Sequence, residues 1–224
     1  MTDISDPAKS SETSAVVPAA VADGRSARSE SNARLTSWAG LVLFVLLAVL
    51  GVTILRIHQL LAVHIAVGFG LIAPLVVKLV STGWRFVHYY AGDQDYVLAG
   101  PPRPLLRILA PLVVISTLAV VGTGVALIAA GPGGRSELLV LHKITFVAWF
   151  GVMTVHVVAY ILPALRWVGA DLGKVGAPRV LARRRARQFA VAASLVAGVL
   201  LAFVGLRWGH PWLASSGVKF LRGR

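Results

Sequence analysis

Three histidines, His64, His142 and His156, stand within otherwise apolar stretches of this sequence. A neutral imidazole can ligate a transition metal through one ring nitrogen while the other nitrogen makes a hydrogen bond. His142 and His156 bound the stretch LHKITFVAWFGVMTVH, where Lys143 is the one charged residue. In a helix this spacing puts them about 40° apart on one face and about 21 Å apart along the axis. Imidazole ligation is therefore the first chemistry to consider.

The composition is that of a membrane protein. Of the 224 residues, 57% are hydrophobic and 14% charged, whereas a soluble domain has about a quarter charged residues. The mean hydropathy is +0.78. The absence of cysteine excludes disulfides, iron–sulfur clusters and thiolate zinc sites. The net charge of +13 comes from Lys and Arg in the links between apolar runs. This is the pattern of membrane topology, so no nucleic-acid partner is predicted.

Five apolar segments are each long enough to cross a membrane as a helix. They cover residues 38–55, 60–80, 108–130, 138–162 and 189–206. We therefore predict an all-α membrane protein, with a four-helix bundle in residues 35–165 and a fifth transmembrane helix in 188–207. Outside these helices we predict a disordered tail in 1–34, a basic link in 166–187 and a C-terminal tail in 208–224.

The distribution of positive charge predicts the orientation. The link between the fourth and fifth segments carries seven Lys and Arg residues against one acid, Asp171. Under the positive-inside rule this link and the N-terminus are cytoplasmic, in a multi-pass protein of the plasma membrane. The run ARRRARQ, residues 182–188, is interpreted as a topology signal that also contacts anionic lipid. Membrane lipid is thus the first predicted partner.

Two of the histidines are predicted to lie at the same depth in the membrane. His64 and His142 each lie about four residues inside the outer end of an inward-running segment, the second and the fourth. Opposed imidazoles in a helix bundle suit haem iron. The alternative is that His142 only hydrogen-bonds a neighbouring backbone carbonyl. Gly68 and Gly70, near His64, admit two interpretations, clearance for a flat macrocycle or close helix packing.

The other basic residues near the apolar segments are given simpler roles. Lys78 lies fourteen residues after His64, near the depth of His156. We expect it to snorkel to the cytoplasmic surface, although pairing with a haem propionate is the alternative. His58 and His88 are interpreted as solvated caps near the interfaces. All nine acids lie outside the apolar cores, which disfavours a proton-coupled transporter.

His64 on the second helix, with His142 and His156 on the fourth, resembles the cytochrome b subunits of membrane-bound formate dehydrogenases and nickel–iron hydrogenases. Bacterial cytochrome b561-like proteins belong to the same broad group. The residue pattern of 64–90 and of 141–156 also resembles that of small cytochrome-b-like membrane proteins of actinobacteria. The resemblance implies an outer haem b between His64 and His142, with His156 as the fourth-helix ligand of an inner haem. The inner partner is missing, because residues 38–55 contain no histidine. Either one haem is bound or His156 has an unusual partner such as His88.

The resemblance implies an electron-transfer subunit rather than a complete enzyme. It would carry electrons between the quinone pool and a partner redox protein, and a molybdopterin oxidoreductase is a candidate for that partner. Two other classes stay open. A haem-free membrane anchor or assembly subunit would have merely packed histidines, and a small transporter would move a solute.

Overall fold

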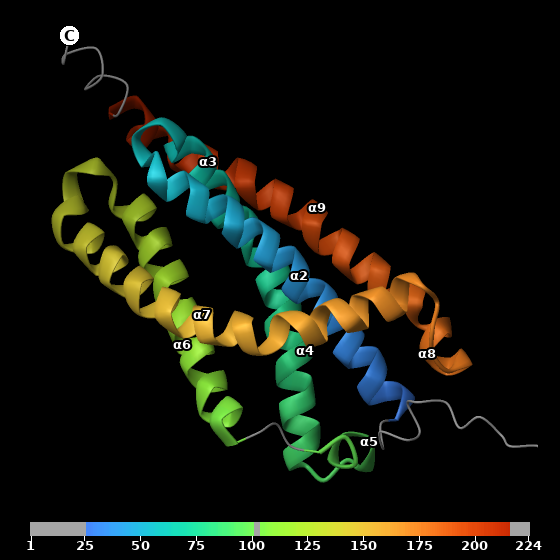
Figure 1. The fold of residues 1–224 in the computed structure, drawn as a ribbon. Helices are drawn as coiled ribbons and strands as arrows, with labels where there is room; N and C mark the ends of the chain where they lie inside the picture. The colour runs from blue at the N-terminus through green and yellow to red at the C-terminus, as the bar shows by residue number, and fades with distance from the viewer. Residues whose placement is uncertain (1–25, 101–103, 216–224) are drawn as a thin grey trace, which may run out of the picture.

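The computed structural model describes residues 26–100 and 104–215, and long helices make up most of this part of the chain (Figure 1). The elements in chain order are α2 (Ala27–Leu55), α3 (Ile57–Gly70), α4 (Ile72–Tyr90), α5 (Gln94–Val97), α6 (Pro104–Ala130), the 3-10 helix η1 (Pro132–Gly134), α7 (Arg135–Leu172), α8 (Pro178–Ala182) and α9 (Arg184–Trp208).

Five helical spans are long and apolar enough to cross a membrane. They are Ala27–Leu55, Ile57–Tyr90, Leu106–Ala130, Ser136–Leu172 and Pro178–Trp208. Their large apolar side chains face outward in many places, as Val158 (73% exposed) and Phe189 (76% exposed) illustrate. Hydrocarbon rather than water is the medium that such a surface suits. The predicted class is confirmed, and the chain is a multi-pass, all-α membrane protein.

The first helix begins earlier than the sequence pattern predicted. Residues 27–34 were assigned to a disordered tail, but α2 starts at Ala27. The Ser26 hydroxyl caps the helix by accepting a hydrogen bond from the Ser29 amide at 3.2 Å. Glu30 and Arg34 in the first turns are buried against protein. This prediction was wrong because these polar residues fold into the molecule. The rest of the predicted tail, residues 1–25, lies outside the described residues.

Two other predicted boundaries also move. The fourth apolar segment continues as helix to Leu172, so α7 includes Pro163 and the start of the predicted 166–187 link. The end of that link, from Arg184, belongs to α9. The predicted C-terminal tail is helical again over residues 210–215. Both α7 and α9 therefore continue past the apolar stretch that is needed to cross the hydrocarbon core.

The spans are arranged as a helix pair beside a larger group. α6 packs along α7, while α2, α3, α4 and α9 pack together, and α7 joins the two parts through its contact with α2. Figure 1 shows α7 bending so that its C-terminal part crosses α2. Pro163 lies in this part of α7, and a proline inside a helix favours a bend because it removes one backbone hydrogen bond.

A break divides the second span into α3 and α4 at Leu71. Pro74 follows three residues later, and its ring disfavours a regular helix one turn upstream. At this break the backbone comes very close to α9. A Cβ added at Gly198 would run into the carbonyl oxygen of Gly70, and one added at Gly205 would lie 2.5 Å from Phe69. Of the two glycines near His64, Gly70 therefore serves helix packing.

Candidate imidazole site

His64 is held by a hydroxyl from the preceding helix. Its Nδ1 lies 2.8 Å from Oγ1 of Thr53, near the end of α2. The Thr53 hydroxyl also lies 2.6 Å from the Leu50 carbonyl oxygen, to which it donates its one proton. The hydroxyl must then accept from His64, so Nδ1 carries the ring proton. The Nε2 atom of His64 is left with an available lone pair.

His142 has the same kind of support from α6. Its Nδ1 lies 3.0 Å from Oγ1 of Thr123. The Thr123 hydroxyl has two carbonyl acceptors in its own helix, Ala119 at 2.8 Å and Val120 at 3.1 Å. The Thr123 oxygen therefore accepts from Nδ1–H, and Nε2 of His142 is again the nitrogen with the lone pair. The backbone contact considered as the alternative for His142 is present as well, since the ring also bonds to the Val120 backbone.

One edge of the His142 ring, at Cε1, also lies against a position without a side chain. A Cβ added at Gly124, on α6, would meet Cε1 of His142 at 3.2 Å. By contrast, a Cβ added at Gly122 would meet nothing within 4 Å. Gly124 therefore provides the room that the His142 ring occupies.

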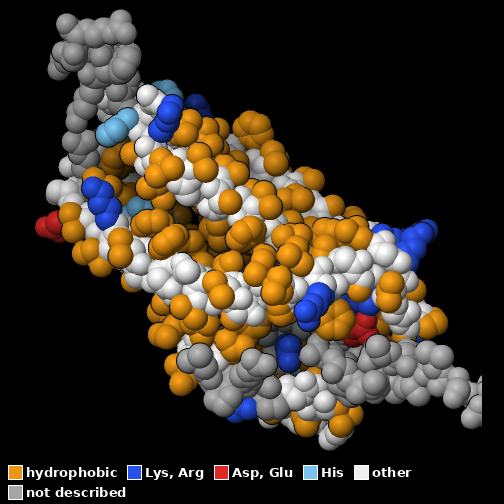
Figure 2. Space-filling view, in the orientation of Figure 1, with side chains coloured by type: hydrophobic (Ala, Val, Ile, Leu, Met, Phe, Trp, Pro, Cys, Tyr) orange, Lys and Arg blue, Asp and Glu red, His pale blue; other side chains and the backbone are white. Residues whose placement is uncertain are grey.

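The two imidazoles belong to different helix pairs and lie close enough to interact electrostatically. The α2–α3 pair carries Thr53 and His64, and the α6–α7 pair carries Thr123 and His142. Among the described residues, α3 packs extensively against neither α6 nor α7. Figure 2 shows a hollow in the surface toward the end of the molecule where histidine side chains gather. We call this end the histidine end and the pair of imidazoles, His64 and His142, the imidazole site.

Open space lies beside His64 at Gly68. A Cβ added at Gly68 would meet nothing within 4 Å. Gly68 is one helical turn after His64, so this space adjoins the imidazole site. The packing interpretation therefore applies to Gly70, whereas clearance for a macrocycle at Gly68 stays a prediction.

His156 lies apart from the imidazole site. Its ring is 4.8 Å from the ring of Tyr160, centroid to centroid, and it interacts electrostatically with Lys78 on α4. The expected match in depth between His156 and Lys78 is thus present. Lys78 does not snorkel to the surface, because its Nζ donates to the Thr36 carbonyl at 2.9 Å and lies against Gly40, both on α2.

The remaining histidines lie away from His156. His88 stacks on Trp84, with ring centroids 4.1 Å apart, and also lies against Tyr96. The structure therefore does not bring His88 to His156 as a second partner. His58 and His210 are exposed, as is Lys143.

Sequence reasoning missed a buried ion cluster at the opposite end, which we call the arginine cluster. Asp171, which is fully buried, pairs with Arg34 at 3.3 Å and with Arg187. Arg34 also pairs with Glu30 at 2.5 Å. The Trp38 indole donates to Asp171 at 3.0 Å. The spacing of Glu30 and Arg34, four residues apart, was the one local signal in the sequence.

The arginine cluster corrects the interpretation of the run ARRRARQ. Arg187 is buried at 3% exposure, and besides Asp171 it donates to Ser31 and to the Val180 carbonyl, each at 3.0 Å. It is thus a structural residue and does not contact lipid. Arg183 and Arg185 in the same run are exposed and stay available to lipid.

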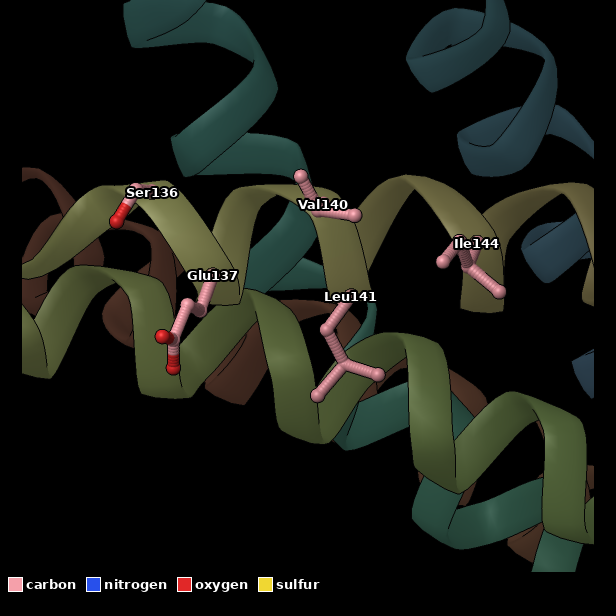
Figure 3. Close-up of a pocket in the computed structure, with 5 residues that line it drawn as sticks. All are labelled: Ser136, Glu137, Val140, Leu141 and Ile144. Carbon is pink, nitrogen blue, oxygen red and sulfur yellow. The ribbon is translucent and has the colours of Figure 1, made fainter.

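A surface pocket elsewhere does not resemble a binding site. Figure 3 shows it on one face of α7, and its lining residues are Ser136, Glu137, Val140, Leu141 and Ile144. Val140, Leu141 and Ile144 are strongly exposed, so the pocket is an open depression on the apolar surface. Within residues 26–100 and 104–215, no three His, Asp or Glu side chains converge as a metal site. The imidazole site, with two ligands from two sides, stays the candidate.

The chain was compared with protein-family models, curated proteins and solved structures, and none of them matches.

The donor set of the imidazole site suits haem iron. Haem iron takes axial ligands from opposite sides, and neutral imidazole nitrogen is a common one. Here each helix pair offers one Nε2 lone pair, with Nδ1 already satisfied by a threonine. Space adjoins His64 at Gly68. The residues present therefore fit a haem bound through His64 and His142.

Proposed function

We propose that this protein is an integral membrane b-type cytochrome that carries electrons through a haem ligated by His64 and His142. The observation that carries the proposal is the pair of threonine contacts, since both rings bond through Nδ1 and leave Nε2 for a ligand. A haem bound there would supply one-electron redox chemistry by cycling its iron between the ferric and ferrous states. His64 and His142 would hold the haem through their imidazole nitrogens, and the helices around them would supply apolar surroundings.

A single haem is the better proposal. The position on α2 that adjoins Lys78 is Gly40, and the Lys78 ammonium covers it. His156 therefore has the Lys78 cation near enough to interact with it electrostatically. A cation beside His156 does not provide the neutral second nitrogen ligand that a bis-histidine haem requires. His156 is assigned to the polar lining of the bundle rather than to an inner haem.

The location in the membrane limits which molecules could exchange electrons with the haem. The outward apolar surface fits membrane lipid, and the positive-inside rule would put the arginine cluster at the cytoplasmic face of the plasma membrane. A partner redox protein, for which a molybdopterin oxidoreductase is a candidate, and membrane quinone would exchange electrons with the haem. The chain would act as an electron-transfer subunit.

An absorbance spectrum tests the proposal. The full-length protein, purified in detergent from haem-replete cells, should give a reduced-minus-oxidised b-type spectrum. His64→Ala and His142→Ala should each abolish it, because each removes one axial ligand. His156→Ala and the exposed control His58→Ala should keep it.

Other experimental outcomes would favour a haem-free membrane anchor or a transporter. A folded wild-type protein without haem would contradict the proposal and favour a membrane anchor. Loss of the spectrum in His156→Ala alone would contradict the assignment of His64 and His142. Solute flux into proteoliposomes without bound haem would favour a transporter.

A further inference from the structure

We infer that Thr53 and Thr123 are paired positioning residues, each of which fixes the tautomer of one histidine and leaves its Nε2 available to a ligand. The inference deepens the proposed function and rests on it for the nature of the ligand. The position of the ring protons follows from the hydrogen bonds alone.

Thr53 can accept a hydrogen bond from His64 because its own hydroxyl proton is donated to the Leu50 carbonyl. Its hydroxyl lies 2.6 Å from the Leu50 carbonyl, a distance at which two acceptors without a shared proton would repel. Thr53 is only 2% exposed, so water does not compete for its oxygen. The Thr53 oxygen therefore presents a lone pair to His64 and accepts Nδ1–H.

Thr123 donates its hydroxyl proton within its own helix in the same way and is reinforced from α7. Thr145 follows His142 by three residues and donates to the His142 carbonyl at 3.0 Å, while its oxygen lies 3.1 Å from that of Thr123. The ring, its own backbone carbonyl and two hydroxyls thus form a closed set of polar contacts. Gly124, on the same helix as Thr123, leaves the room in which this ring lies.

The hydrogen bond at Nδ1 affects how strongly Nε2 binds a ligand. The two nitrogens of an imidazole point away from each other, so a threonine that binds Nδ1 leaves Nε2 directed away from that hydroxyl. A hydrogen bond from the far nitrogen fixes ring orientation and raises the basicity of the ligating nitrogen. Loss of such a partner typically lowers metal affinity about 10-fold to 100-fold.

The first test concerns the protein itself and does not require bound haem. The full-length chain with 15N-labelled histidine, prepared without haem in lipid nanodiscs, is studied by NMR. The wild type should show Nδ1–H tautomers for His64 and His142, each identified by its loss in the corresponding His→Gln variant. Thr53→Val and Thr123→Val keep the side-chain shape without the hydroxyl, and each should shift the tautomer of its own histidine alone.

The second test concerns the haem-loaded protein. Thr53→Val and Thr123→Val should lower haem affinity about 10-fold or more and raise the reduction potential, because a less basic imidazole stabilises ferric iron less. Thr53→Ser and Thr123→Ser keep the hydroxyl and should restore both values. Thr154→Val is the matched control, since the Thr154 hydroxyl donates only within α7, to the Phe150 carbonyl at 2.8 Å.

The outcomes separate the two claims. Nε2–H tautomers in the wild type would overturn the inference, and so would unchanged tautomers and unchanged potentials in both valine variants. A wild type with the expected tautomers that binds no haem would leave the inference standing as a statement about the histidines and would contradict the proposed function instead.

Discussion

At the residue scale, one short contact decides whether His142 can hold its position. Gly124 lies on α6 directly against the imidazole ring, and the space there is smaller than a methyl group needs. Interiors packed this closely transmit small changes in volume to their neighbours. The ring is also held by polar contacts with α6, to the Thr123 hydroxyl and to the Val120 backbone. A small displacement would therefore change both the contact and the direction of Nε2.

Gly124→Ala should displace the His142 ring by a few tenths of an ångström. An overpacked position costs about 1–3 kcal/mol, and here the cost falls on the geometry of a ligand. We expect reduced haem content and a broadened b-type spectrum, measured after purification from haem-replete cells. Gly122→Ala, two residues away in the same helix, has open space and should match the wild type. Equal haem content in both variants would contradict the role of Gly124.

At the element scale, glycines on α9 allow it to approach α3 and the break before α4. Gly198 and Gly205 are seven residues apart and thus face the same side of α9. Gly198 meets the backbone at Gly70, and Gly205 meets the ring of Phe69. Small residues at such crossings let membrane helices pack closely when hydrophobic burial supplies no driving force. This packing holds α3, and with it His64, in place.

Gly198→Ala should destabilise the bundle by about 1–3 kcal/mol, because the added methyl would meet rigid backbone rather than a flexible side chain. The apparent Tm of the purified protein in detergent, followed by circular dichroism, is the measurement. Gly51→Ala is the control, since a Cβ there meets nothing within 4 Å. A Tm for Gly198→Ala equal to that of Gly51→Ala would show that the crossing is looser than described.

At the scale of the whole molecule, the arginine cluster ties together parts that are distant in sequence. Asp171 near the end of α7 binds Arg34 of α2 and Arg187 of α9. Arg34 also donates to the Val175 carbonyl at 2.6 Å, in the link that follows α7. Buried charges are tolerated only when they are paired and hydrogen-bonded. The cluster thus joins three membrane spans at the end opposite the imidazole site.

Asp171→Asn should destabilise the protein by about 3–5 kcal/mol, because it leaves two buried guanidinium groups without their shared carboxylate. Denaturation of the purified protein in detergent would measure the loss. Asp95→Asn breaks only a partly exposed pair with Arg28 and should cost about 1 kcal/mol or less. The prediction fails if the two variants unfold alike.

The sequence by itself determined the class of the fold and the candidate ligands. Apolar runs of membrane-spanning length require helices, because backbone groups in hydrocarbon must bond within their own segment. His64 and His142 could be matched in depth because rise per residue is fixed. Only the tertiary structure decided what these residues contact. The hydroxyls of Thr53 and Thr123, the carbonyl that binds Lys78 and the partners of Asp171 all come from other helices. A sequence pattern records which face of a helix is polar, but side-chain partners depend on how the helices pack around one another.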